Sequence, residues 1–267
     1  MTICVLGDAH LDVIARVSGP LAPDTDTPAS TAVVVGGQAA NVAAWVTALG
    51  GRSRLIAARG TDMGAHLVAA ELQRRGVEVV GPVVAGNAGV VISLSDGGTR
   101  RSMVTDRGVG PLLSAAAFSP DWLADCEWLH VPAYSLTEDP VRGAALAAAS
   151  AAAQRGLPLS IDLSSTAAIR AFGVAEFREL LTRLQPEVVL GNGEEADLVA
   201  GVLDERLVVK LGADGVRAGG RRYPALPTEP VDSTGAGDAF AAGYLLGGIE
   251  LGLTAAARAV AQMGAMP

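Results

Sequence analysis

Short apolar segments alternate with longer segments of helical periodicity over most of this 267-residue chain. The first, residues 2–7, ends in a Gly-Asp pair, which is typical of a buried strand followed by a turn. After residue 110 the alternation is regular, and this indicates a parallel sheet with helices on both faces. The predicted strands are residues 2–7, 54–58, 77–84, 127–131, 157–163, 187–191 and 206–211. The predicted helices are residues 39–49, 63–75, 114–124, 138–155, 174–184, 193–200, 236–247 and 254–264.

Two segments interrupt this alternation. Strand patterns at 12–17 and 31–35 flank a loop rich in proline, aspartate and threonine, and those at 88–95 and 100–105 flank Asp96-Gly97-Gly98-Thr99, a hairpin signal. We therefore expect one domain, residues 1–267, with a small separate β element formed by about 10–35 and 80–105. A further short hairpin is predicted at 215–223.

Composition narrows the class of protein. Half of the residues are hydrophobic and 18% are charged, which excludes intrinsic disorder. The net charge of −8 argues against nucleic acid as a partner, and only 4% of residues are aromatic, too few to favour base-stacking platforms. Cys4 and Cys126 form neither a disulfide framework nor a zinc motif, so a cytoplasmic location is expected. The apolar start is broken by Asp8 and Asp12, unlike a signal peptide, and the run Gly143 to Ala153 is too short to span a membrane.

The segment Asp232-Ser-Thr-Gly-Ala-Gly-Asp-Ala-Phe240 carries the strongest chemical signal. Gly235, Ala236 and Gly237 lie where a loop enters a predicted helix, so backbone N–H groups can converge there on an anion. Asp238 falls in the first helical turn, beside that site. An anion site with an adjacent carboxylate suits phosphoryl transfer to an alcohol, in which the carboxylate takes the hydroxyl proton. The alternative is a glycine-rich helix start in which Asp238 is only a favourable N-terminal charge.

Two further segments suggest a ligand. Gly36 and Gly37 precede a helix of small residues and permit close approach of a ligand, and Asn41 offers a donor and an acceptor to hydroxyl groups. Asp8 and Asp12 follow the first strand, at the edge where open α/β sheets bind ligands. The alternatives are a helix start with Asn41 in solvent and ordinary turn chemistry for the aspartates.

Other candidates are weaker. Asn192 with Glu195, and the run Lys210-Leu-Gly-Ala-Asp-Gly215, match neither a Walker loop nor a GxGxxG motif. The three histidines, His10, His66 and His130, are scattered, and we expect structural roles for them. Arg100 and Arg101 are interpreted as solvated hairpin residues, with substrate contact as the alternative.

In this order, the segments resemble the ribokinase-like family, also called the phosphofructokinase B family of carbohydrate kinases. The resemblance runs from Gly7-Asp8 to Gly264-Ala265. GGQAANVA, residues 36–43, is similar to the family's N-terminal signature, and DSTGAGDAF, residues 232–240, to its C-terminal one. The resemblance implies a ribokinase-like three-layer α/β/α sandwich with a mainly parallel central sheet and a small β lid. It also implies an ATP-dependent kinase that phosphorylates a sugar or nucleoside hydroxyl.

The resemblance assigns roles residue by residue. Asp238 matches the catalytic base, and Gly235, Ala236 and Gly237 match the anion hole. Asp12, Gly37 and Asn41 match sugar-contacting positions, and the adjacent Gly36 and Gln38 are expected to bind the substrate with them. Asn192 and Glu195 match the motif that organises Mg²⁺ and phosphates, although Gly191 replaces the commoner proline. Lys210, Gly212 and Gly215 match the nucleotide-contacting strand and loop. Asp232 matches a position near a monovalent cation, which makes K⁺ a candidate activator.

Two departures leave the acceptor open. His10 and Gln38 stand where ribokinases proper often have asparagine and lysine, so the resemblance does not specify ribose. The main hypothesis is a sugar kinase that uses ATP and Mg²⁺. One alternative is a nucleoside kinase of the adenosine or pseudouridine type, and another is a non-catalytic regulator that binds a nucleotide or sugar. A homodimer through the edges of the β lid is also expected, because exposed edge strands tend to pair.

Overall fold

The structure is a computed structural model that describes residues 1–95 and 101–267. In these residues, nine strands form a central sheet in the order β13-β12-β11-β10-β9-β8-β1-β4-β5. Its pairs are parallel from β11 to β5, and β12 and β13 add an antiparallel edge. The strands are β1 (Thr2–Leu6), β4 (Arg52–Ile56), β5 (Glu78–Val80), β8 (Trp128–Pro132), β9 (Leu159–Asp162), β10 (Val188–Asn192), β11 (Leu207–Lys210), β12 (Val216–Ala218) and β13 (Arg221–Tyr223).

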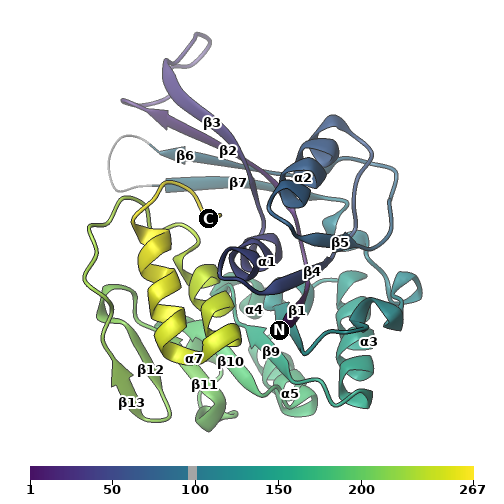
Figure 1. Ribbon diagram of the computed structural model, residues 1–267. Coiled ribbons are helices and arrows are strands. Elements are labelled where there is room, and N and C mark those ends of the chain that lie inside the picture. Colours follow the sequence, from purple (N-terminus) through teal and green to yellow (C-terminus); the bar gives the residue numbers. More distant parts are fainter. Residues whose placement is uncertain (96–100) are drawn as a thin grey trace.

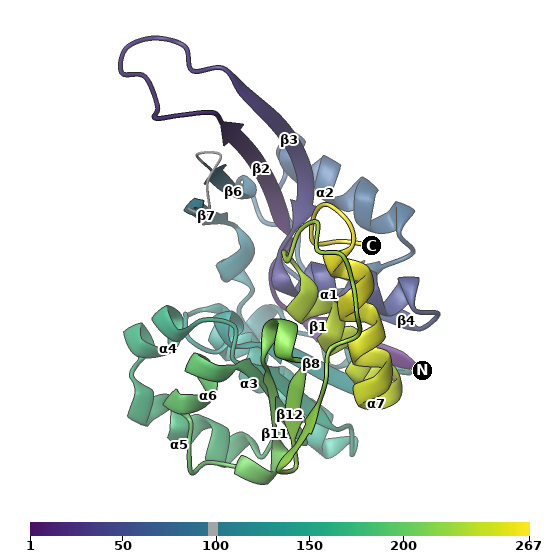
Figure 2. The ribbon, with the colours of Figure 1, turned by 90° about the vertical axis from the view of Figure 1, so that its left-hand side faces the viewer.

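Helices cover both faces of this sheet (Figure 1, Figure 2). On one face lie α1 (Gln38–Ala48), α2 (Met63–Arg74) and α7 (Ala236–Val260). On the other lie α3 (Val141–Gln154), α4 (Thr166–Phe172), α5 (Val174–Leu184) and α6 (Gly193–Leu198). Single 3₁₀ turns, η1 (Gly110–Leu112), η4 (Ala133–Ser135), η5 (Asp204–Arg206) and η6 (Gly212–Asp214), connect several of these elements.

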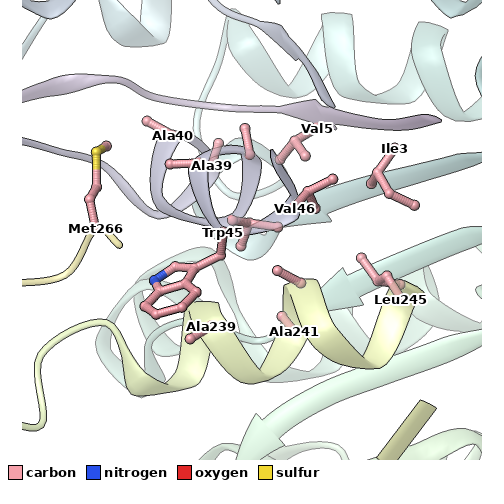
Figure 3. Close-up of a cluster of buried hydrophobic side chains, with 14 of the residues drawn as sticks. Ile3, Val5, Ala39, Ala40, Trp45, Val46, Ala239, Ala241, Leu245 and Met266 are labelled. Carbon is pink, nitrogen blue, oxygen red and sulfur yellow. The ribbon is translucent and has the colours of Figure 1, made fainter. Parts of the chain in front are cut away.

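Each face of the sheet has its own hydrophobic core. Along β1 the buried side chains alternate: Ile3 and Val5 enter the core under α1 and α7, while Cys4 and Leu6 enter the opposite one. This is why a strand buried on both faces reads as a continuous apolar run in the sequence. In the first core, the indole of Trp45 on α1 lies beside the start of α7 and points toward the C-terminal segment (Figure 3).

The lid is a second sheet, in the order β3-β2-β6-β7. Its strands are β2 (His10–Val17), β3 (Ala29–Gly36), β6 (Ala88–Ser95) and β7 (Arg101–Gly108), and β2 is parallel to β6. The predicted fold class, a mainly parallel α/β/α sandwich with a small β lid, is confirmed. Residues 80–87 lie mostly outside this sheet, since β5 ends at Val80 and a single bridge joins Val83 to Arg59. The hairpin signal Asp96–Thr99 and Arg100 lie outside the described residues.

One helix prediction is wrong, and one helix was missed. Residues 114–124 form two 3₁₀ turns, η2 (Ala115–Ala117) and η3 (Pro120–Leu123), because Pro120 disfavours helical geometry at Ser119, which is extended. The pattern gave no sign of α4, which Ser165 caps. The two helices predicted at 236–247 and 254–264 correspond to the two segments of α7, which the non-helical residues Gly247 and Gly248 separate. Taken as one run, α7 is long and apolar enough to cross a membrane, but it is broken at these glycines and packs against α1 in the core.

Candidate active site

A cleft of about 710 Å³ lies between the carboxyl ends of the central strands and the lid. Its walls come from the chain between β1 and β2, from the start of α1, from lid strands β6 and β7, and from the ends of β9, β10 and β11. The first turn of α7 also lines it. The topology thus brings together segments that are more than 200 residues apart in the sequence, at the sheet edge where open α/β folds bind ligands.

A hydrogen bond between Asn41, in the N-terminal signature segment, and Asp238, in the C-terminal one, connects the two segments beside this cleft. Asn41 Nδ2 donates a hydrogen bond to Asp238 Oδ2 at 2.8 Å. Gly37 permits this arrangement: its φ of 104° is one that other residues rarely adopt, and a side chain there would overlap the backbone of Asp8. The helix that carries Asn41 therefore starts directly against the loop that follows β1.

The surroundings of Asp238 prepare its carboxylate to accept a proton. The pKa of Asp238 is raised from its usual value to about 7, chiefly by burial and in addition by the negative charge of Asp162. The hydrogen bond from Asn41 and the positive charge of Lys210 act in the opposite direction. A carboxylate with a pKa near neutrality is a much better general base than an ordinary surface aspartate.

The loop that leads into α7, residues 232–237, has the shape of an anion site and is called the anion loop below. Gly235 is the N-cap residue with a φ of 75°, and among the described residues no side chain caps this helix. Asp232 fixes the loop: its Oδ1 accepts from Thr234 N at 2.9 Å, and its Oδ2 accepts from Gly264 N at 3.1 Å. A Cβ at Gly235 would lie 2.5 Å from the Cα of Ala265, so only glycine fits there. First-turn N–H groups of a helix lack intrahelical partners and favour an anion.

On the lid side of Asp238, the cleft presents oxygen acceptors. Asp8 Oδ1, Asp12 Oδ1, Gln38 Oε1 and Asn41 Oδ1 are buried and have no hydrogen-bond partner in the described part of the chain. Asp12 Oδ1 lies 3.1 Å from His10 Nε2, but the two are not aligned for a hydrogen bond. Buried acceptors are normally satisfied, so this group calls for a ligand with several donors. Figures 1 and 2 show how β1 leads straight into lid strand β2 at this point.

Gly36 and Asp232 do not line this cleft, and Ala236 lines a neighbouring pocket instead. Gly36 lies behind Asp12, where a side chain would overlap the carboxylate. The other residues predicted for the acceptor and phosphoryl groups, namely Asp12, Gly37, Gln38, Asn41, Gly235, Gly237 and Asp238, all line it.

An arginine from the lid reaches into the end of the cleft that holds the unpaired oxygens. Arg107 on β7 donates from Nε to Asp8 Oδ2 at 2.7 Å, and it also pairs with Glu138, which precedes α3. Its guanidinium lies 5.9 Å from the centre of the Tyr134 ring. Arg107 therefore ties the lid to the core beside the unsatisfied acceptors.

A second pocket, of about 570 Å³, adjoins the cleft on the side of α7. Mainly apolar residues of the loop after β13 and of α7 line it, among them Leu226, Pro227, Phe240 and Val260. Gly215, with a φ of 88°, also lines it. Lys210, Gly212 and Gly237 line both cavities, so the two spaces meet at these three residues.

Asn192 and Glu195 form a capping box at the start of α6. Asn192 Oδ1 accepts from Glu195 N and Glu195 Oε2 accepts from Asn192 N, both at 2.9 Å. Burial raises the pKa of Glu195, and the bond from Asn192 N lowers it in part. The described residues contain no cluster of three or more His, Cys, Asp or Glu side chains that could hold a metal. The pair therefore fits a Mg²⁺ whose ligands are mainly phosphate and water.

Asp162, Arg107 and His10 are among the cleft residues that the sequence interpretation missed. Asp162 ends β9 and follows the same rule that singled out Asp8, a carboxylate at the carboxyl end of a parallel strand, so that signal was available. Arg107 and His10 line the cleft too. Only the pairing of the lid strands brings Arg107 there, whereas His10 was expected to be structural. His130 is buried against Ser160, as a structural histidine would be.

A carboxylate with a raised pKa lies beside the N-terminus of α7, between a polar cleft and an apolar pocket, and this arrangement suits a phosphotransferase with an alcohol group as acceptor. A family model, "pfkB family carbohydrate kinase", matches residues 1–266, and the chain belongs to this family.

A curated relative agrees with this membership, and two solved structures share the fold. A fructokinase from Klebsiella pneumoniae is 31% identical over 271 residues, which cover 92% of this chain and 83% of the relative. A solved adenosine kinase from Sinorhizobium meliloti superposes with a TM-score of 0.84 at 24% identity, covering 99% of this chain and 95% of the other. A structure from E. coli, named ribokinase II and solved with ATP and Mg²⁺, superposes with a TM-score of 0.84 at 21% identity, covering 99% and 94%.

Proposed function

We propose that this kinase transfers the γ-phosphoryl group of ATP to a hydroxyl group of a neutral sugar, with Asp238 as the general base. The observation that carries the proposal is the Asp238–Asn41 pair, which lies between the anion loop and the unsatisfied acceptors of the lid side. Asp238 takes the proton of the hydroxyl as its oxygen bonds to phosphorus, and the bond to the ADP oxygen breaks.

The anion loop stabilises the charge that develops on the transferring group. The N–H groups of the turn that runs from Gly235 into α7 point away from the helix, and the helix dipole adds to their effect. Their geometry is fixed in advance by Asp232 and by the C-terminal segment at Ala265. Little reorganisation is then needed when the reaction starts, which is where such sites gain most of their catalytic effect.

The acceptor is a molecule with several hydroxyl groups. Asp12 Oδ1, Gln38 Oε1 and Asn41 Oδ1 are unpaired accepting oxygens, so they favour a ligand that donates hydrogen bonds. The carboxylates of Asp8 and Asp12 disfavour an acceptor that already carries negative charge near them. These features support a neutral sugar.

The nucleotide occupies the pocket on the α7 side. Its apolar walls suit the adenine ring, and the phosphates extend from it past Gly212 toward Gly237. Mg²⁺ accompanies the phosphates near Asn192 and Glu195, mainly through water. When bound, it neutralises phosphate charge. Potassium is proposed as an activator near Asp232, on the family resemblance alone.

A screen for ADP release tests the function. Purified protein is incubated with Mg·ATP and a panel of neutral sugars, phosphorylated sugars and nucleosides, with and without K⁺. We expect a neutral sugar to give the highest kcat/KM. A nucleoside as best acceptor would instead establish the alternative enzyme, in which Tyr134 and Met103 of the cleft would contact the base. ATP binding without ADP release on any acceptor would indicate a non-catalytic binding protein.

Assembly and location complete the proposal. The edges of the lid are β3 and β7, and β3 is exposed from Ala29 to Val33, so a second copy of the chain could pair there. Light scattering tests the dimer, because a monomer at micromolar concentration contradicts it.

Cys4 and Cys126 are free thiols, which supports a reducing compartment such as the cytoplasm.

A further inference from the structure

Lys210 is the only lysine among the 20 lysine and arginine residues of the chain. It ends β11, and its Nζ donates to Asp162 Oδ2 at 2.6 Å. Asp162 ends β9, so the ion pair reaches across the end of β10, which lies between these two strands. Asp162 is 1% exposed and the Lys210 side chain 17%, and that remaining exposure is to the cavities.

The structure holds Asp162 firmly in this position. Its second oxygen, Oδ1, accepts from Ser164 N at 3.1 Å. Ser164 adopts a φ of 63°, unusual for a residue other than glycine, and its hydroxyl oxygen accepts from Ala133 N at 3.1 Å. Backbone conformations of this kind cost free energy and concentrate at functional sites. An ordinary surface ion pair would not need this support.

The ammonium group lies against the anion loop. A Cβ on Gly237 would be 3.3 Å from Lys210 Nζ, so the missing side chain of this glycine leaves room directly beside the charge. Lys210 also lines both the acceptor cleft and the nucleotide pocket. A group transferred from one cavity to the other must pass this point. A compact ammonium fits such a gap better than the broad, planar guanidinium that the chain uses elsewhere.

We propose that Lys210 is a catalytic residue that contacts the transferring phosphoryl group, and that Asp162 is the positioning residue that holds its ammonium there. The inference rests on the proposed phosphoryl transfer and adds a side-chain cation to the backbone N–H groups of the loop. Lys210 gives up no proton. The acceptor oxygen bonds to phosphorus, the bond to ADP breaks, the hydroxyl proton goes to Asp238, and Lys210 neutralises charge on the phosphoryl oxygens.

Kinetics separate this role from simple nucleotide binding. Lys210→Met removes the charge at similar length, and the double variant D162N/K210M also removes the counter-charge, which leaves a neutral pair that does not bury an unpaired carboxylate. We expect kcat of both variants to fall by about 100-fold or more, as for the loss of one charge-stabilising donor, with KM for ATP little changed. An unchanged kcat, or an effect confined to KM, would overturn the proposal.

A single label provides a readout independent of turnover. Because the chain has one lysine, protein grown on [ε-¹³C]lysine gives one protein side-chain resonance, which K210M removes and so identifies. We expect Mg·AMPPNP to shift this resonance, and Mg·ADP, which lacks the γ-phosphoryl group, to shift it much less. Equal shifts with both nucleotides would refute contact with the transferring group.

The two experiments also distinguish this inference from the proposed function. If no acceptor is phosphorylated by the wild type, the proposed function fails, while the labelled lysine still reports whether Lys210 contacts the γ-phosphoryl group. If the wild type is active and the label does not discriminate between the two nucleotides, only the role of Lys210 fails. D162N is the matched variant for positioning: it should weaken the response of the label to Mg·AMPPNP while the fold, measured by circular dichroism, stays intact.

Discussion

The chemistry of this site depends on the pKa of one carboxylate, that of Asp238, which several groups raise or lower. Burial and Asp162 raise the pKa of Asp238, while Asn41 and Lys210 lower it, and the result is near 7. The same group must therefore be buried enough to be basic and still reachable by the acceptor. Asp238 is half-buried and lines the cleft, which meets both conditions.

A pH profile tests the base. Asp238 must be ionised to accept a proton, so we expect kcat/KM to fall as pH decreases through about 7. Asp238→Asn should lower kcat at least about 100-fold, as for the loss of a general base, and leave ATP binding largely intact. Initial rates between pH 5 and 9 measure both effects. Near-normal turnover of D238N would contradict the assignment.

The two charged neighbours should move this profile in opposite directions. Lys210 lowers the pKa of Asp238, so the acid limb of K210M should shift to higher pH. Asp162 raises that pKa, so the limb of D162N should shift to lower pH. The groups that act on Asp238 are Asn41, Asp162 and Lys210, and N41A would also shift the limb upward. Profiles that stay fixed in both single variants would show that these charges do not control the base.

Stability should respond to pH through the same group. The pKa of Asp238 is higher in the folded chain than in the unfolded chain, so the folded state holds this proton more tightly. Its contribution to stability is present at low pH and is lost as pH rises from about 4 through about 7. Because D238N has no such ionisation, its Tm relative to the wild type should be higher at pH 8 than at pH 5. Differential scanning calorimetry at both pH values checks this, and an equal difference would argue against a raised pKa.

Single residues were predicted best where the local sequence itself requires a conformation. Gly37 and Gly235 have positive φ, and neighbouring backbone leaves no room for a side chain at either position. Each glycine lies in one of the two signature segments. Asp162 and Arg107 were missed for different reasons. Asp162 obeys a rule that applies to every parallel strand and does not select among them. Arg107 enters the cleft only through the pairing of β7 with β6, a contact with no local trace in the sequence.

At the scale of elements, the packing of α1 on α7 positions both halves of the site. The indole Nε1 of Trp45 donates to the carbonyl of Ala265 at 2.8 Å in the core, and Ala265 packs on Gly235. The C-terminal segment thus supports the anion loop from behind. The pattern of apolar residues predicted α1 and the two segments of α7, but it could not show how these helices pack on one another.

Trp45→Phe tests this support. The variant keeps an aromatic ring but leaves the Ala265 carbonyl without its donor, which costs about 1–3 kcal/mol when buried. We expect a lower Tm together with a lower kcat, because the loop loses its backing. Trp128→Phe is the matched control, since Trp128 donates to Ser160 Oγ at 2.9 Å away from the anion loop. It should lower Tm alone. Equal kinetic effects of the two variants would refute a specific link to the loop.

At the scale of the whole molecule, the lid and the core share the acceptor site. Arg107 connects β7 to Asp8 after β1 and to Glu138 before α3. The alternation of strands and helices predicted the core sheet, and the interruptions of that alternation predicted a separate β element. Which lid face covers the cleft depends on strand register, and the sequence did not determine that.

Arg107→Met should act on the acceptor alone. The variant releases a lid contact at the acceptor end of the cleft, and we expect KM for the acceptor to rise about tenfold, the equivalent of roughly 1.4 kcal/mol, with little change in KM for ATP. Steady-state kinetics with each substrate varied in turn measure this. Arg142→Met, which removes an arginine paired with Asp139 outside the cleft, is the control and should change neither constant. A rise in KM for ATP of the same size would contradict the assignment.

The short connections between the two sheets have a mechanical consequence. Only residues 7–9 separate β1 from β2, and Gly37 alone separates β3 from α1. Both connections border the acceptor site, so the lid is hinged on the segments that bear Asp8, Asp12 and Asn41. Any tilt of the lid must displace the oxygens that bind the acceptor, and an acceptor that satisfies those oxygens fixes the angle of the lid. We therefore expect the size of a bound acceptor to set the position of the lid.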